Sequence, residues 1–436
     1  MIVNSIVNYN LNNEIKKVSY ELAHRFSNLE LSIKNDTEIN QNRELLLSFA
    51  QGISGLCILY GELDSIYPEN SWDELGHRVL IQIVEQFEQL GINSLSAFGG
   101  LAGLSFSVST LSRNGTRYKK LLSTLHSLFL DNLDNYLKNF NPTYNQGMNN
   151  YLFDTCYGLA GIGRYLLIMS KNKRVNRLIV QILKIMVRLT KNVTVNGTDV
   201  PGWFTSRLYN SQFDIGFFDT GLAHGICGPL NLMSLSLSEG YCVNNQKESV
   251  IKITDWLLSK VFEDENGLWI PNTISFQDEI NLTGYNSNAR DAWCYGLPGI
   301  CRSLFIAGNS LGRLDLIEIS KRYFDEVRKR NFKQQLNNSP TFCHGLSGLL
   351  HITNIMNKEI NDEGLSDYQI RIVREILGYY DEKLPFGFQD INIRNGRVLI
   401  ENKLGLLEGS IGILLALLAY SNQGSSTGWD KLFLLN

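Results

Sequence analysis

The sequence lacks the features of an exported, membrane-spanning or nucleic-acid-binding protein. Its start has no basic segment followed by an apolar run and a small-residue cleavage site, so we expect no secretion signal. The most apolar stretch, residues 411–420, is far shorter than the roughly 20 residues that cross a bilayer. Lys and Arg number 40 against 43 Asp and Glu, without a basic stripe that would displace counterions from nucleic acid. We therefore expect neither a transmembrane segment nor a nucleic-acid partner.

Cysteine is sparse, and the number of cysteines is odd. Seven cysteines are scattered over 436 residues with no export signal before them. This pattern favours reduced thiols in a cytoplasm over a disulfide framework. Hydrophobic residues make up 44% of the chain and charged residues 19%, which is typical of a globular protein with a large core. We expect a cytoplasmic location, with some thiols binding metal and others packed in the core.

One short motif recurs along the chain, namely Gly-x-x-Gly followed by an apolar run. A single copy means little, but seven copies about 60 residues apart indicate an internal repeat that accounts for almost the whole chain. The copies occupy residues 52–55, 100–103, 158–161, 225–228, 296–299, 345–348 and 409–412. The glycines allow the chain to enter each following helix sharply.

Each repeat predicts two helices of different character. The apolar segments after the motifs, such as residues 56–63, suit helices that are buried on nearly all sides. The segments between motifs are amphipathic, and the clearest begins at Ser71, which forms an S-x-x-E capping box with Glu74. One apolar face then follows at helical spacing. It consists of Leu75, Val79, Ile83, Phe87 and Leu90.

These repeats predict an all-α fold. A pair of one inner and one outer helix cannot bury its own apolar surface, so repeated pairs must be capped or close on themselves. Seven pairs closing on themselves give an α/α toroid, which we expect to form one domain over residues 1–436. Residues 193–218 and 384–407 interrupt the helical pattern with β-branched and aromatic residues among turn formers. We expect irregular or strand-bearing excursions there.

Reactive residue types gather just before the glycines, where the repeat geometry places them at one end of the central cavity. Cys294 precedes the fifth motif, and Cys343 and His344 precede the sixth. Two thiolates and an imidazole, with a fourth position left open, have the composition of a catalytic zinc site. The alternative is that they are buried cysteines and a core histidine, which is the more common situation for such residues elsewhere.

Other residues at the positions just before the motifs suggest proton transfer. His224 precedes the fourth motif and could bind metal or cap a helix, but proton transfer is the better role because three ligands already complete an open site. Asp154 and Arg290 share one position relative to the motif and would pair, either for catalysis or as a plain ion pair. In a catalytic role, Asp154 would orient His224 or bind peptide, and Arg290 would fix Asp154. Cys156 shares the cysteine slot but lies two repeats from Cys294, so we interpret it as a packing residue.

Four segments that contain these residues resemble the lantibiotic cyclase family, the lanthionine synthetase C-like proteins. They are DTCYGLAG from residue 154, GLAHG from residue 221, WCYGLPG from residue 293 and CHGLSG from residue 343. The resemblance extends over essentially the full chain, and it implies a toroid of seven inner and seven outer helices with one bound zinc ion. It also assigns roles by position. The ligands would be Cys294, Cys343 and His344, the acid/base residue His224, and the supporting polar residues Asp154, Arg290 and Tyr295.

The resemblance implies an activity and partners. A zinc-dependent cyclase of this family adds peptide cysteine thiols to dehydroalanine or dehydrobutyrine, which forms lanthionine or methyllanthionine rings in a lantibiotic precursor. Its partners would be the dehydrated precursor peptide and, in a biosynthetic complex at the inner face of the membrane, a dehydratase and an export transporter. The alternatives are addition of another thiol such as glutathione, a non-catalytic peptide-binding scaffold, and a glycosidase that uses Asp154 and Glu408.

Overall fold

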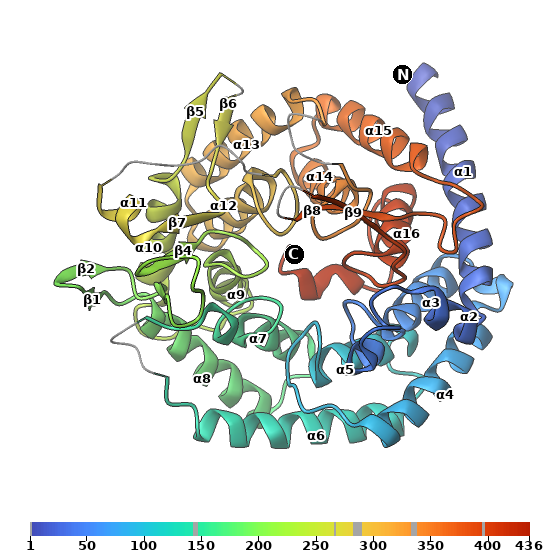
Figure 1. Cartoon of the computed structure of the whole chain (residues 1–436), viewed down its shortest axis with the longest axis horizontal. Coiled ribbons are helices and arrows are strands. Elements are labelled where there is room, and N and C mark those ends of the chain that lie inside the picture. Colours follow the sequence, from blue (N-terminus) through green and yellow to red (C-terminus); the bar gives the residue numbers. More distant parts are fainter. Residues whose placement is uncertain (1, 143–146, 266, 282–289, 333–337, 395–396) are drawn as a thin grey trace. The chain divides into compact units, whose positions relative to one another are not determined.

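The chain folds mainly into α-helices (Figure 1). The structure is a computed structural model that describes residues 2–142, 147–265, 267–281, 290–332, 338–394 and 397–436. A helix begins at or directly after each of the seven motifs. These helices are α3 (Ser54–Ile66), α5 (Leu101–Leu111), α7 (Leu159–Ile168), α9 (Cys227–Ser238), α12 (Leu297–Leu311), α14 (Leu346–Ile360) and α16 (Ser410–Ser421). The predicted relation between motif and helix is therefore confirmed.

A second group of helices alternates with these along the chain. They are α1 (Ile2–Phe26), α4 (Trp72–Leu90), α6 (Lys119–Lys138), α8 (Lys173–Leu189), α10 (Gln246–Leu258), α13 (Leu314–Lys329) and α15 (Glu363–Gly378). Two short helices, α2 (Leu29–Asn35) and α11 (Phe276–Asn281), complete the α-helical elements of the described residues. None of the helices in this part of the chain is both long and apolar enough to cross a membrane.

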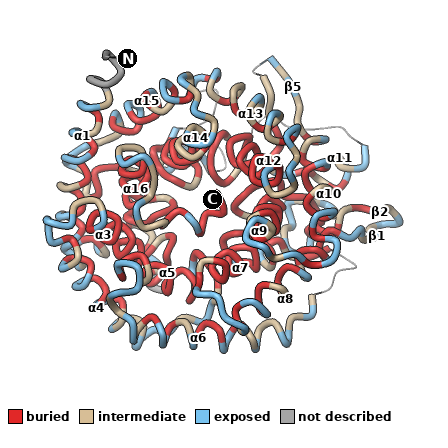
Figure 2. The backbone as a smooth tube through the Cα atoms, turned by 180° about the vertical axis from the view of Figure 1, so that it is seen from behind, coloured by how far each residue is buried: buried red, intermediate tan, exposed pale blue. Residues whose placement is uncertain are grey.

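The two groups of helices differ in burial as predicted (Figure 2). In α16, every residue from Ser410 to Ala419 is buried, because the helix is apolar on all sides. In α8, the buried residues instead recur at helical spacing and leave the charged face in water. Apolar burial of this kind stabilises the fold by about 25 cal/mol per Å² removed from water.

Two glycines show why the motif needs residues without side chains. At Gly412 a Cβ atom would lie 1.9 Å from the carbonyl oxygen of Leu406, so no larger residue fits the turn that enters α16. Gly296 has a φ of +90°, a backbone conformation that side chains disfavour, and it is the residue before α12. The motif therefore encodes a tight entry into the helix.

The start of α4 differs from the prediction. Ser71 adopts a left-handed conformation with φ 54° and ψ 30°, and its side chain makes no capping hydrogen bond. A capping box requires an extended N-cap residue, so this prediction was wrong. The predicted apolar face is largely present, because Leu75, Val79 and Ile83 are buried, but Leu90 at the end of α4 is 50% exposed.

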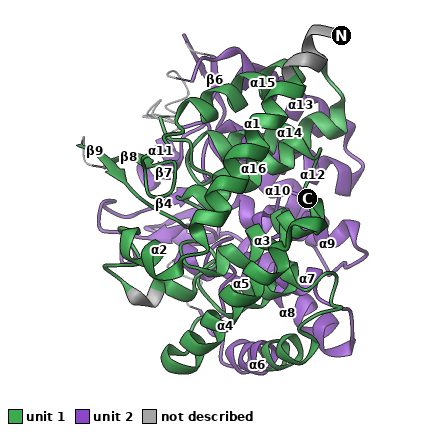
Figure 3. Ribbon diagram, turned by 90° about the vertical axis from the view of Figure 1, so that its right-hand side faces the viewer, with its two compact units in different colours: residues 1–94, 98–127, 337–430 green, residues 95–97, 128–336, 431–436 purple. Residues whose placement is uncertain are grey.

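The described residues form two compact units (Figure 3). Unit 1 comprises residues 1–94, 98–127 and 337–430, and unit 2 comprises residues 95–97, 128–336 and 431–436. In unit 1 the motif helices pack in the order α14, α16, α3 and α5, with α15, α1 and α4 against them. In unit 2 the order is α7, α9 and α12, with α8, α10 and α13 against them. The single-domain organisation stays a prediction.

Short antiparallel strands interrupt the helices. Residues 193–218 carry β1 (Val193–Val195), β2 (Thr198–Val200), β3 (Thr205–Ser206) and most of β4 (Gly216–Asp219), and residues 384–407 carry β8 (Asp390–Arg394) and β9 (Arg397–Glu401). The sequence analysis missed β5 (Phe262–Asp264), β6 (Gly267–Trp269) and β7 (Thr273–Ser275). Strands of three residues are too short for a visible alternation of polar and apolar positions. The sheet β3-β4-β7 positions Asp219, the last residue of β4.

Candidate functional site

Unit 1 contains a group of residues able to hold a metal ion. Cys343 and His344 lie in the loop before α14, and Glu408 lies in the loop before α16. Their ligand atoms all lie within 4.8 Å of one another. The Cys343 amide donates a hydrogen bond of 2.7 Å to the carbonyl of Leu407, which ties the two loops together. Thiolate, imidazole and carboxylate are all zinc ligands, so this donor set fits the predicted metal.

His344 is held by a carboxylate on one ring nitrogen and has a second carboxylate near the other. Its Nε2 lies 2.8 Å from Oδ1 of Asp390, and its Nδ1 lies 3.7 Å from Oε1 of Glu408. His344 is 6% exposed and Asp390 1%. Burial raises the pKa of Asp390, but the hydrogen bond from His344 and the charges of His344 and Lys403 outweigh burial and hold that pKa below its usual value. Nδ1 is therefore the ring nitrogen on the side of Glu408.

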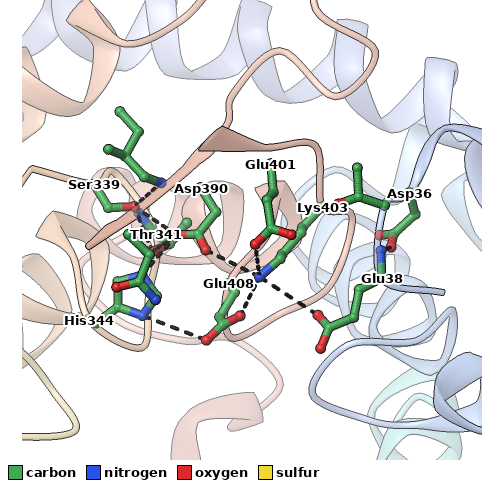
Figure 4. Close-up of polar contacts among 12 residues, drawn as sticks. Asp36, Glu38, Ser339, Thr341, His344, Asp390, Glu401, Lys403 and Glu408 are labelled. Atoms are coloured by element: carbon green, nitrogen blue, oxygen red, sulfur yellow. Dashed lines mark hydrogen bonds and ion pairs between the residues drawn. The ribbon is translucent and has the colours of Figure 1, made fainter. Parts of the chain in front are cut away.

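A buried lysine connects the acidic groups around this cluster (Figure 4). Nζ of Lys403, a residue that is 4% exposed, lies 2.6 Å from Glu408, 3.0 Å from Glu401, 3.3 Å from Asp390 and 3.8 Å from Glu38. Burial lowers the pKa of Lys403, but the surrounding carboxylates outweigh it and raise that pKa. One ammonium group cannot neutralise four carboxylates. The cluster thus carries an excess of negative charge that a bound cation would offset.

Unit 2 contains a histidine–aspartate pair. Nδ1 of His224 lies 2.7 Å from Oδ2 of the fully buried Asp154. The other oxygen, Oδ1, accepts hydrogen bonds from the amides of Tyr157 and Gly158 at 2.7 and 2.6 Å, where the chain turns into α7. The structure therefore contains the contact through which Asp154 would orient His224. The expected ion pair with Arg290 is not among the ion pairs of the described residues, because Asp154 is occupied by His224 and these amides.

His224 is partly accessible and lies between aromatic rings. Its side chain is 28% exposed, the ring of Tyr157 stacks on it at 5.7 Å, and the ring of Tyr151 meets it edge-on at 5.4 Å. Burial lowers the pKa of His224, but the hydrogen bond and charge of Asp154 outweigh burial, and Asp219 and Cys294 add to the net increase. With Nδ1 bound to Asp154, Nε2 is the nitrogen available for proton exchange.

Asp219 is a site residue that the sequence analysis missed. Its Oδ1 accepts a hydrogen bond from the Gly221 amide and its Oδ2 from the hydroxyl of Tyr295, both at 2.9 Å. Burial raises the pKa of Asp219 to about 6, although the charge of His224 and these hydrogen bonds oppose the increase. The sequence held one signal, since an Asp-Thr pair precedes the motif at both Asp154 and Asp219. Tyr295 thus contacts Asp219 through its hydroxyl group.

The remaining predicted residues lie in the loops of unit 2. Cys294 is 6% exposed, and its carbonyl accepts a hydrogen bond of 2.9 Å from the Leu222 amide, which joins the loops before α12 and α9. Cys156 is 3% exposed. Burial raises its pKa well above the ordinary value, and the charges of Asp154 and Cys294 add to this effect. The convergence of Cys294 with Cys343 and His344 stays a prediction.

Comparison with known proteins agrees with this description. The chain is 24% identical over 409 residues to the nisin biosynthesis protein NisC of Lactococcus lactis subsp. lactis, and the match covers 89% of each chain. The solved structure of a nisin cyclase superposes with a TM-score of 0.76 at 20% sequence identity, covering 98% of both chains. This likeness confirms the predicted all-α fold, an α/α toroid. A family model for lanthionine synthetase C-like proteins matches residues 45–434. The chain therefore belongs to the lanthionine synthetase C-like protein family.

Proposed function

We propose that the chain is a zinc-dependent cyclase that closes lanthionine and methyllanthionine rings in a dehydrated precursor peptide. The observation that carries this proposal is the group formed by Cys343, His344 and Glu408 in a member of this family. The names of its relatives, a nisin biosynthesis protein and a nisin cyclase, favour the same reaction. The paired His224 and Asp154 supply the second requirement, a group that can transfer a proton.

The metal ligands in this proposal are Cys294, Cys343 and His344. Three protein ligands leave a fourth position for the sulfur of a substrate cysteine. Zinc bound there would lower the pKa of that thiol, so that the nucleophilic thiolate exists at neutral pH. The chain itself contributes the fixed imidazole of His344 and the negative cluster around Lys403, which together favour a cation at this place.

His224 completes the addition by proton transfer. The substrate sulfur forms a bond to the β-carbon of the dehydrated residue, and the electrons of the carbon–carbon double bond move to the α-carbon as an enolate. Protonated His224 then delivers a proton to the α-carbon, while Asp154 holds Nδ1 and so directs Nε2 to the substrate. One proton leaves the thiol and one arrives at carbon, so the ring closes without net gain or loss of atoms.

Other residues have supporting roles in this scheme. Tyr295 donates its hydroxyl hydrogen to Asp219, which holds the carboxylate beside the His224 loop. Arg290 places a positive charge at the start of the loop that carries Cys294. The partners we propose are the dehydrated precursor peptide and a complex with a dehydratase and an export transporter, in the cytoplasm at the inner face of the membrane.

Incubation of the purified protein with a dehydrated precursor peptide tests the proposal. Ring closure leaves the peptide mass unchanged but consumes one free thiol per ring, so alkylation followed by mass spectrometry counts the rings. We expect thiol loss with the zinc-loaded protein and none after removal of zinc with a chelator. Unchanged thiol counts would contradict the proposal. Formation of a glutathione adduct when glutathione is supplied, without ring closure, would favour the alternative thiol addition.

A further inference from the structure

The buried aspartate that contacts His344 has no role in the scheme above. Asp390 is the first residue of β8, and 46 positions separate it from His344 in the sequence. Its carboxylate is surrounded by donors. Oδ1 lies 3.1 Å from the hydroxyl of Ser339, 3.4 Å from that of Thr341 and 2.8 Å from Nε2 of His344, and Oδ2 lies 3.3 Å from Nζ of Lys403. A carboxylate held on both oxygens in this way has a fixed position.

This arrangement determines where the hydrogen of the imidazole lies. An ionised carboxylate only accepts hydrogen bonds, so Nε2 of His344 must be the nitrogen that carries hydrogen. In the neutral ring, Nδ1 then keeps its lone pair, and it is the nitrogen that lies on the side of Glu408. A neutral imidazole with a free lone pair is the form that binds zinc, and the hydrogen bond on the other nitrogen sets both tautomer and ring orientation.

We infer that Asp390 is a positioning residue that presents Nδ1 of His344 to the metal, with Lys403, Ser339 and Thr341 holding Asp390 in place. The inference rests on the proposed function, because it takes His344 as a metal ligand. It adds a residue from the strand-bearing excursion to a site otherwise built from the loops before the motif helices. Loss of such a partner typically weakens metal binding about 10–100-fold.

The chain offers a matched control in Glu401. Its carboxylate lies 3.0 Å from Nζ of Lys403, as close to this lysine as Asp390 is, but it makes no hydrogen bond to His344 among those of the described residues. Asp390→Asn and Glu401→Gln therefore remove the same charge from the same ion-pair network. Only the first changes the acceptor on Nε2 of His344.

The experiment measures zinc affinity of the full-length variants by competition with a chromophoric chelator. We expect Asp390→Asn to bind zinc about 10–100-fold more weakly than the wild type, and Asp390→Ala at least as weakly. Glu401→Gln should stay within about threefold, since a partly solvated partner of an ion pair contributes little. Melting temperatures of the metal-free proteins identify losses that come from unfolding. Equal affinities of Asp390→Asn and Glu401→Gln would overturn the inference.

A second measurement needs no variant. In metal-free wild-type protein with ¹⁵N-labelled histidine, the ring nitrogen shifts of His344 report its tautomer, and we expect hydrogen on Nε2. With the shifts read at alkaline pH, where the imidazole is neutral, hydrogen on Nδ1 would overturn the inference even if Asp390 variants failed to fold. The proposed function has a separate test in His344→Ala. If that variant kept its zinc, the ligand assignment itself would be wrong, whereas zinc loss in His344→Ala beside normal binding in Asp390→Asn would refute only the role of Asp390.

Discussion

Both units pair a histidine with a buried aspartate, but the aspartate contacts a different ring nitrogen in each unit. Each places a histidine one position before the first glycine of a motif, and each pairs that histidine with a buried aspartate. In unit 1, Asp390 takes Nε2 of His344 and leaves Nδ1, whereas in unit 2, Asp154 takes Nδ1 of His224 and leaves Nε2. The position in the repeat therefore does not decide which ring nitrogen remains for a ligand or a proton. The nitrogen that the aspartate occupies does.

Accessibility separates the two histidines further. The side chain of His344 is 7% exposed, and that of His224 is 28% exposed. A buried imidazole surrounded by excess carboxylate suits a fixed cation, because metal binding needs one rigid lone pair. A partly exposed imidazole beside aromatic rings can exchange protons with substrate and solvent. The comparison predicts metal binding by His344 of unit 1 and proton transfer by His224 of unit 2, and each role can be removed separately.

The largest effect should follow removal of a metal ligand. We expect the wild-type chain to carry about one zinc ion, and Cys294→Ala, Cys343→Ala and His344→Ala to carry almost none and to form no rings. Helical content should persist, because packing of the motif helices holds the fold. Metal analysis and far-ultraviolet circular dichroism on the same samples check this. Full zinc content in all three variants would contradict the ligand assignment, and with it the metal-binding role of His344.

The next effect should follow loss of the proton-transfer histidine. We expect His224→Ala to keep its zinc but to close rings about 10²–10⁴-fold more slowly, which is the usual contribution of a general acid or base. His77→Ala is the control, since His77 is exposed and its ring stacks on Tyr118 away from the motif loops. Metal analysis measures the zinc content, and the loss of free thiols over time measures the rate of ring closure. Zinc loss as complete as in Cys343→Ala would make His224 a ligand.

The sequence could predict the helical framework because its signal is local. Each motif and the apolar run behind it lie within about a dozen residues, so periodicity reveals the helix without knowledge of its neighbours. The same locality placed Cys343, His344 and His224 correctly before their helices. The capping box at Ser71 failed because backbone conformation, and not residue type, decides whether the side chain can cap.

The partners of these residues could not be predicted, because they come from distant segments. Asp390 is 46 positions from His344, and Asp219 is 76 positions from Tyr295. Of the four acidic residues near Lys403, Glu401 and Glu408 are close to it in the sequence, whereas Glu38 comes from the start of the chain. Such contacts depend on how the excursions fold back onto the helix starts. Asp154 is a mixed case, since its contact with His224 was expected, whereas the ion pair with Arg290 is not among those of the described residues.

A smaller effect should appear in the pH dependence of Asp154→Asn. Asp154 contributes to the raised pKa of His224, and the protonated form donates the proton, so activity falls as pH rises through this pKa. Without the carboxylate the pKa of His224 falls, and the decline should begin at lower pH than in the wild type. The pH profile of kcat measures this, with the exposed Asp199→Asn as control. A decline at unchanged pH would show that another group donates.

The smallest effect should follow Cys156→Ser, which tests whether unit 2 contributes a second thiolate. Cys156 is buried and lies two motifs away from Cys294 in the sequence, so we interpret it as a packing residue of the core. We therefore expect the variant to keep its zinc and most of its cyclisation activity. A buried hydroxyl in place of the thiol should reduce the free energy of unfolding by about 1–3 kcal/mol. Cys57→Ser, in the core of α3, should show a similar loss of stability.

Cobalt substitution makes this last test decisive, because each coordinating thiolate adds charge-transfer intensity. Without peptide, the wild type and Cys156→Ser should both show the intensity of two thiolates. If the wild type showed three and Cys156→Ser two, Cys156 would be a ligand and the fourth position would be closed by the protein. A metal with four protein ligands is typical of a structural site. Unit 2 would then contribute two thiolates, Cys294 and Cys156, and no position would remain at the metal for the substrate thiol that the proposed function requires.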